Sequence, residues 1–165
     1  MIYSLRRYIT HRFTATNHHG VHSPFVFDYV TKCLYTKPNY SGSVIENIVL
    51  KSVAYFAIDR FYTPAENGTM QNRIQRVLDV KVSEEPPFDL IYLNAPMPNV
   101  VHTYAHTVHN DSLIVLANIH RSAQASSIWK KVSADKRVTV SIDLFHCGIL
   151  FLRKEQEKQH FKIRI

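Results

Sequence analysis

The sequence predicts an α/β protein in which two helices precede a sheet of about five strands that ends in an antiparallel hairpin. Two observations predict this fold. In residues 88–165, strand-like segments alternate with helix-like segments, which is typical of parallel βα units. Near the end, residues 138–144 and 149–152 are both strand-like and are separated by a tight turn before Gly148. Such a sheet is typical of folds that bind nucleotides or cofactors at the carboxyl ends of their strands.

The first 36 residues are expected to form a helical cap. The first helix is predicted from apolar residues at helical spacing, which are Ile2, Leu5, Ile9 and Phe13. A second helix should begin at Ser23 and Pro24, because serine is a good N-cap and proline suits the first helical position.

The middle of the chain, residues 43–85, has a less certain pattern. Residues 44–49 favour a helix. Residues 53–58, VAYFAI, are either a buried strand or a continuation of that helix, because periodicity alone cannot assign so short an apolar run. A further helix is expected from Thr69, and residues 84–87 should break the chain before the next strand.

The last part of the chain carries the firmest pattern. Strands are predicted at residues 90–94, 113–117, 138–144, 149–152 and 160–165, and helices at residues 100–109 and 122–132. On the first of these helices, His102, His106 and His109 would share one stripe. No carboxylate is spaced to complete a metal site there, so we predict no bound metal.

Composition and charge narrow the classes of protein. The chain has 165 residues, of which 45% are hydrophobic, and no apolar run approaches the ~20 residues needed to cross a bilayer. Cys33 and Cys147 form no Cys-x-x-Cys pair, so we expect no disulfide framework and a cytoplasmic protein. The net charge of +7 would suit nucleic acid, but no nucleic-acid module is visible. A solvated basic surface is the preferred interpretation, and nucleic-acid binding is a distant alternative.

Two segments resemble a known family. These are RRYITHRFTATNHHGVHSPFVFDYV at residues 6–30, and residues 88–165 with FDLIYLN, SLIVLANIHRS and TVSIDLFHCGILFLRK. They are similar to small class I S-adenosylmethionine-dependent methyltransferases of Bacteroidetes-type bacteria, related to the O-methyltransferases. The resemblance implies a bacterial protein with a single domain over residues 1–165 and a truncated Rossmann-like methyltransferase sheet.

The chain also departs from this family. No Gly-x-Gly occurs, although such enzymes bring a glycine-rich turn after the first strand close to the cofactor. Where the family has carboxylates after two later strands, this chain has Asn94, and Ala117 with Asn118. We therefore predict a degenerate, non-catalytic methyltransferase-like protein that acts by binding or assembly. The alternative is an active S-adenosylmethionine-dependent O-methyltransferase that acts on a small molecule.

In the active alternative, the resemblance assigns roles to particular residues. Asp59, just after residues 53–58, would hold the ribose of S-adenosylmethionine, and Asn94 and Asn118 would lie near the methyl donor. His120 would be the general base, without the carboxylate that orients it in the family. His19 and His22 would form a loop on the substrate side, or a loop with only a structural role.

The resemblance also implies that the central first strand of the sheet is missing. Residues 90–94 would then form an unpaired edge, which is a template for association. Either residues 53–58 pair with this edge, or two chains meet along it as a homodimer.

Overall fold

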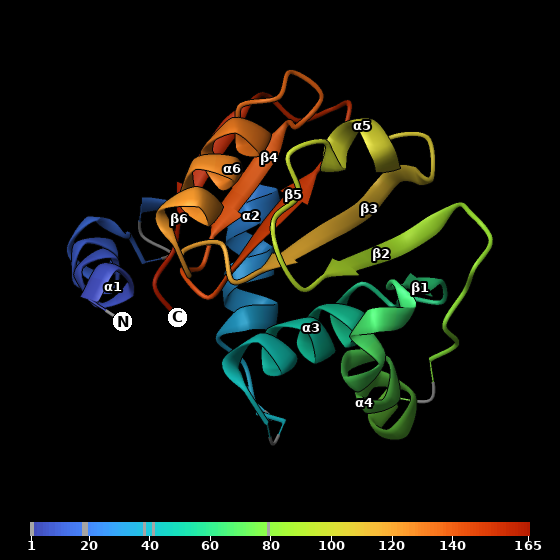
Figure 1. The fold of residues 1–165 in the computed structure, drawn as a ribbon. Coiled ribbons are helices and arrows are strands. Elements are labelled where there is room, and N and C mark those ends of the chain that lie inside the picture. Colours follow the sequence, from blue (N-terminus) through green and yellow to red (C-terminus); the bar gives the residue numbers. More distant parts are fainter. Residues whose placement is uncertain (1, 18–19, 38, 41, 79) are drawn as a thin grey trace.

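The computed structural model describes residues 2–17, 20–37, 39–40, 42–78 and 80–165. A six-stranded sheet in the order β1-β2-β3-β5-β4-β6 lies at its centre (Figure 1). The strands are β1 (Phe61–Tyr62), β2 (Phe88–Leu93), β3 (Val108–Ala117), β4 (Val140–Asp143), β5 (Cys147–Phe151) and β6 (Gln159–Lys162). Strand β5 runs antiparallel to β3 and β4, whereas the pairs β1–β2, β2–β3 and β4–β6 are parallel. The predicted α/β class and closing hairpin are confirmed, with six strands instead of about five.

Helices cover both faces of this sheet. They are α1 (Ile2–Thr14), α2 (Pro24–Tyr29) with its π-helical continuation η2 (Val30–Leu34), α3 (Val44–Tyr55), η3 (Ala65–Asn67), α4 (Gly68–Leu78), α5 (Val100–Tyr104) and α6 (Ala123–Ser133). One core cluster joins α2, α3 and α4 to one face of the sheet, and a second joins α5 and α6 to the other face. The described chain is therefore a three-layer α/β arrangement.

Serine residues cap several of these helices, as the sequence suggests. Ser23 precedes Pro24 and accepts a hydrogen bond from the backbone of α2. Ser43 forms a capping box with Glu46 at the start of α3, and Ser122 caps α6 in the same manner without the reciprocal bond.

The middle of the chain supplies the first strand, which is present after all. Residues 53–58 are not a strand, because α3 continues through Tyr55 and the chain then turns. The strand that pairs with β2 is β1, which begins three residues after residue 58, and Val82 forms a parallel bridge on its other side. The edge of β2 is therefore paired within the chain, and this edge no longer provides a reason for two copies to associate.

The helix predicted over residues 100–109 is also shorter than expected. It ends at Tyr104, and His109 lies in β3, where its Nε2 is 2.7 Å from Oδ1 of Asp89. The three histidines therefore do not share one helical face. In the described residues no cluster of His, Cys, Asp and Glu could hold a metal ion.

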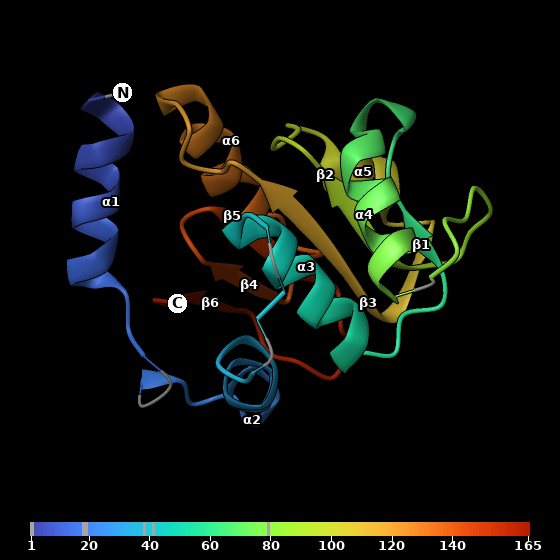
Figure 2. The same ribbon diagram turned by 90° about the horizontal axis from the view of Figure 1, so that it is seen from below.

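Helix α1 lies beside the sheet near β6, apart from the other helices in both views (Figures 1 and 2). Its apolar stripe faces outward, because Leu5, Ile9 and Phe13 are 61%, 49% and 87% exposed. His11, on the opposite side of the helix, is buried against the sheet. The apolar spacing thus predicted the helix correctly, but it is a polar face that packs against the body of the protein.

Candidate functional site

The carboxyl ends of the parallel strands meet at one edge of the sheet. There β2 is followed by Asn94, β3 by Asn118, and β4 by the turn of residues 144–146. In open α/β sheets this edge is where ligands bind. It is therefore the first place to look for a site.

The tips of β2 and β3 are joined to each other and to the β4 turn. The Asn118 side chain donates a hydrogen bond of 3.0 Å from Nδ2 to the backbone oxygen of Asn94. The Asn118 backbone has a φ of 60° and donates its N–H to the oxygen of His146 at 2.7 Å. Asparagine tolerates this left-handed conformation better than most residues. The two asparagines therefore lie together, and the Asn118 side-chain amide bridges the two strand tips.

The tip of β1 leads directly into a helix. Gly68 opens α4 in a strand–loop–helix context. A Cβ at Gly68 would meet open space, so no close approach requires glycine here. The hydroxyl of Thr63, just after β1, is buried without a hydrogen-bond partner in the described part of the chain.

These tips fit S-adenosylmethionine poorly. Pro64 has no N–H to offer, and Asn94 and Asn118 stand where a carboxylate would hold an ammonium group or a substrate proton. Thr63, Asn94 and Asn118 line none of five cavities that the described residues form. The unpaired Thr63 hydroxyl is the one feature that favours a ligand at this point.

Asp59 is placed at the opposite edge of the sheet from these asparagines. Its backbone N–H donates to Oδ2 of Asp89 at 2.9 Å, and Asp89 is the second residue of β2. Asp59 follows the turn after α3 and not the carboxyl end of a strand. The geometry that the ribose role required is absent because residues 53–58 are not a strand.

The histidine loop before α2 is only partly described. His19 lies outside the described residues. His22 is exposed and lines a cavity of about 430 Å³ with residues 159–162 of β6, a cavity that His120 does not line. The structure therefore does not bring His22 and His120 together.

His120 does have a carboxylate partner, contrary to the sequence-based expectation. Its Nε2 is 2.8 Å from Oδ2 of Asp143, the last residue of β4, and its Nδ1 is 2.9 Å from the hydroxyl of Ser126 in α6. His11 of α1 approaches the other carboxylate oxygen, with Nε2 3.1 Å from Oδ1. Both ring nitrogens of the buried His120 therefore have a hydrogen-bond partner within the protein.

Asp143 is the electrostatic centre of this group. Burial raises the pKa of its carboxyl, but the hydrogen bonds from His11 and His120 outweigh burial and hold the pKa well below its usual range. The carboxylate is therefore ionised, and it ties α1 and the segment after β3 to β4. The sequence pattern does not distinguish Asp143, because it is one of several polar residues that alternate with apolar residues along a strand.

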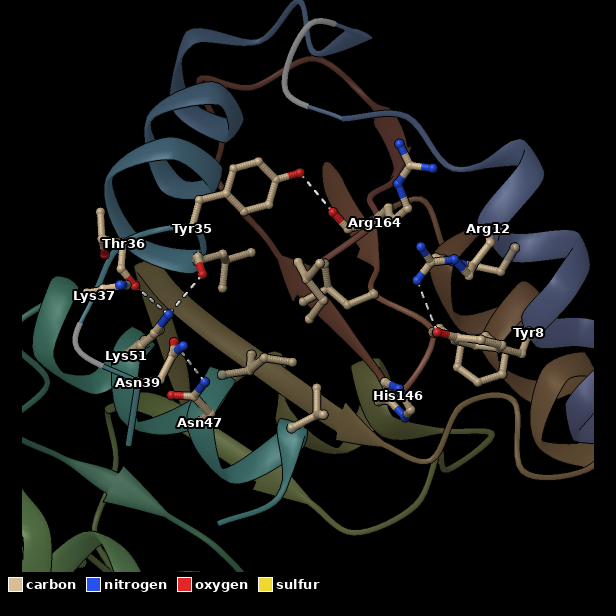
Figure 3. Close-up of a pocket in the computed structure, with 17 residues that line it drawn as sticks. Tyr8, Arg12, Tyr35, Thr36, Lys37, Asn39, Asn47, Lys51, His146 and Arg164 are labelled. Carbon is tan, nitrogen blue, oxygen red and sulfur yellow. Dashed lines mark hydrogen bonds between the residues drawn. The ribbon is translucent and has the colours of Figure 1, made fainter. Parts of the chain in front are cut away.

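The largest described cavity lies on the same edge of the sheet, beneath α1 (Figure 3). Its volume is about 510 Å³, in the range of small-molecule sites. Its walls come from α1, the end of η2 and the loop after it, the start of α3, the β4–β5 turn and the C-terminal residues. We call it the α1–α3 cavity.

Polar groups around the α1–α3 cavity are held in place by the chain itself. Lys51, buried in α3, donates from Nζ to the backbone oxygens of Leu34 at 3.0 Å and Thr36 at 2.6 Å. The Tyr35 hydroxyl donates to the oxygen of Arg164 at 2.8 Å, and Figure 3 shows this bond across the top of the cavity. The walls are therefore preorganised, which lowers the cost of binding a ligand.

The cavity is basic and partly apolar. Its cationic side chains are Arg12, Lys37, Lys51 and Arg164, and its apolar ones are Leu34, Val44, Ile48, Leu144, Phe145 and Ile165. No Asp or Glu side chain lines it among the described residues. Burial lowers the pKa of His146 in its wall, and the charge of His11 lowers it further, so this imidazole is neutral at pH 7.

Local sequence patterns do not predict this cavity, because its lining residues come from five separate segments. The one local signal was Lys51, a single cation within the apolar run of α3. A lysine in such a run must reach a partner, and here it reaches the end of η2.

Comparison with known proteins identifies no family. No protein-family model and no curated protein matches the sequence. Among solved structures it resembles the "Crystal structure of a putative O-methyltransferase from Klebsiella pneumoniae", with 14% sequence identity and a TM-score of 0.45 over 71% of this chain and 83% of that chain. A likeness this weak says nothing about activity. In the described residues, none of the helices has the length and apolarity to pass through a membrane.

Proposed function

We propose that this chain is a methyltransferase-like binding protein without catalytic activity, which holds a small organic anion in the α1–α3 cavity. The observation that carries this proposal is the contrast along one edge of the sheet. A preorganised cavity of about 510 Å³ lies beneath α1, whereas the tips of β2 and β3 are bridged by Asn118 and Asn94.

The chemistry of the walls selects the ligand class. Cations from four separate segments face a space lined by no described Asp or Glu side chain, so negative charge is favoured there. The apolar residues favour a ring or short aliphatic part on the same molecule. An aromatic or branched carboxylate or sulfonate satisfies both requirements.

The test is binding of 1-anilinonaphthalene-8-sulfonate, an aromatic sulfonate, followed by fluorescence. Arg164→Gln should weaken binding about tenfold, or about 1.4 kcal/mol, because it removes an exposed cation of the cavity. Arg121→Gln, which removes an equal charge outside the described cavities, should change it less than about twofold. Equal effects of the two variants would refute the proposed site.

An active methyltransferase is the second candidate, favoured by the unpaired Thr63 hydroxyl and by the β1–α4 connection that Gly68 opens. Calorimetry with S-adenosylhomocysteine separates the two. Micromolar binding lost on Thr63→Val would support the enzyme, whereas no heat at about 1 mM ligand would leave the binding protein.

We further propose that the protein assembles as a homodimer, through the outward stripe of α1 and not through the sheet edge. Leu5, Ile9 and Phe13 form an exposed apolar row at i, i+4 and i+8, on the side of α1 opposite the buried His11. A two-fold axis would pair this row with its copy. Cys33 and Cys147 are buried free thiols, which suits a reducing cytoplasm.

A further inference from the structure

A second cavity lies on the other side of α1, between this helix, α6 and β4. Its volume is about 200 Å³ and we call it the α1–α6 cavity. Since a water molecule occupies about 30 Å³ in the liquid, the space holds a group several times larger than water. The two cavities beside α1 share His11 and no other lining residue.

Basic side chains that are far apart in the sequence converge on this cavity. Arg7 comes from α1, Lys130 from α6 and Lys162 from β6. Lys162 donates to the hydroxyl of Thr14 at 3.1 Å. Arg7 and Lys130 have no side-chain hydrogen bond or ion pair with any residue in the described ranges. Two exposed cations are thus available to a ligand.

The wall beneath these cations is polar and internally satisfied. Asp143 is the only carboxylate among the described lining residues, and both of its oxygens already accept hydrogen bonds. Oδ1 accepts from the N–H of Phe145 at 2.9 Å and contacts His11, and Oδ2 contacts His120. The negative charge is therefore directed into the protein, and the hydroxyls of Ser126, Ser133 and Thr10 complete the lining.

We propose that the α1–α6 cavity binds phosphate, either free or as the terminal group of a small phosphomonoester. Guanidinium and ammonium groups from separate elements match the several oxygens of this anion. A ligand that contacts Arg7, Lys130 and Lys162 joins α1 to α6 and β6. It would therefore fix the position of the helix that also covers the α1–α3 cavity.

The test is calorimetric titration of the full chain with inorganic phosphate and with phenyl phosphate. The double variant Arg7→Gln/Lys130→Gln should weaken binding at least about tenfold, or about 1.4 kcal/mol. The matched control is Lys131→Gln/Lys136→Gln, which removes the same charge at exposed positions outside the described cavities. It should change binding by less than about twofold.

Several outcomes would overturn the proposal. These are the absence of binding up to about 10 mM phosphate in the wild type, or equal weakening in both double variants. A third is binding to vesicles that contain phosphatidic acid with no response to inorganic phosphate, which would indicate a lipid surface. If the first double variant is poorly folded, Lys162→Gln alone should still weaken binding several-fold, and an unchanged affinity would count against the site.

Discussion

The two halves of the carboxyl edge of the sheet use their loops in opposite ways. At the β1–β2–β3 half, a side-chain amide bridges two strand tips, and the residues there line none of the best-formed cavities in the described chain. At the β4–β6 half, α1 lies outside the sheet, and there is a cavity on each side of this helix. Both halves lie at the edge where open α/β sheets bind ligands. In the second half, the cavities are lined in part by basic side chains and bordered by a helix that lies outside the sheet.

The difference shows that a binding surface does not require the strand–loop–helix element usually associated with this kind of sheet. The α1–α3 cavity is walled by the helical cap, α3 and the C-terminal residues, which the sheet only supports. Its stability should therefore depend on the contacts that attach α1 to the sheet. Those contacts converge on Asp143.

The largest expected effect comes from Asp143→Asn, a substitution in the β4–β6 half of the sheet edge. It removes the buried charge that His11 and His120 share, and should lower the free energy of unfolding by about 3 kcal/mol. Urea unfolding measures this change. Asp111→Asn, a largely exposed position paired with Arg153, is the control and should cost less than about 1 kcal/mol. Similar losses in the two variants would mean that the Asp143 group does not hold α1 in place.

Next in size is a pair of glycine substitutions that compares the two halves directly. A Cβ at Gly148 in β5 would overlap the buried ring of Trp129, so Gly148→Ala should cost about 1–3 kcal/mol. Gly68, in the β1–β2–β3 half, has helical backbone angles, and a Cβ there would meet open space. Gly68→Ala should therefore raise the free energy of unfolding by about 0.4–1 kcal/mol. Thermal unfolding of both variants gives the comparison. If Gly68→Ala were less stable than the wild type, a constraint would act after β1 that the geometry at Gly68 does not explain.

The pH dependence of stability should show the contribution of Asp143 in the β4–β6 half. Because the pKa of Asp143 is lower when folded than when unfolded, its contribution is present above the unfolded value of about 3.9 and is lost as the pH falls through the folded value. The difference between wild type and Asp143→Asn should therefore be constant near neutral pH and shrink below about pH 4. Unfolding curves at several pH values check this. A difference that grew on acidification would contradict the ionised carboxylate.

How much of this the sequence could predict differed between the two halves for physical reasons. The strands and helices of residues 88–152 were predictable because strongly apolar runs alternate with capped helices, as Ser122 before α6 shows. The first strand was missed because β1 has only two residues, so neither length nor alternation marks it. Residues 53–58 could not be assigned because a short apolar run suits a buried helix as well as a strand.

The candidate site was harder to predict than the fold. The resemblance placed Asn94 and Asn118 near a methyl donor, and the structure shows that the two residues are joined by a hydrogen bond. The group of His11, Asp143 and His120 was missed, because its members are 132 and 23 residues apart in the sequence. Only the antiparallel pairing of both β3 and β4 with β5, and the position of α1, bring them together. The cations of both cavities were visible as net charge, but their convergence could not be read from local patterns.

The smallest expected effect on stability comes from the outward stripe of α1. Leu5→Glu/Phe13→Glu places charges on side chains that are 61% and 87% exposed, so the free energy of unfolding of the monomer should change by no more than about 0.5 kcal/mol per site. Self-association should nevertheless be lost, because two copies would then bring like charges together. Analytical ultracentrifugation at high micromolar concentration measures the mass of both forms, with Arg121→Gln as an exposed control. A wild type that sediments as a monomer would remove the proposed dimer, whereas a dimer unaffected by the double variant would place the interface away from α1.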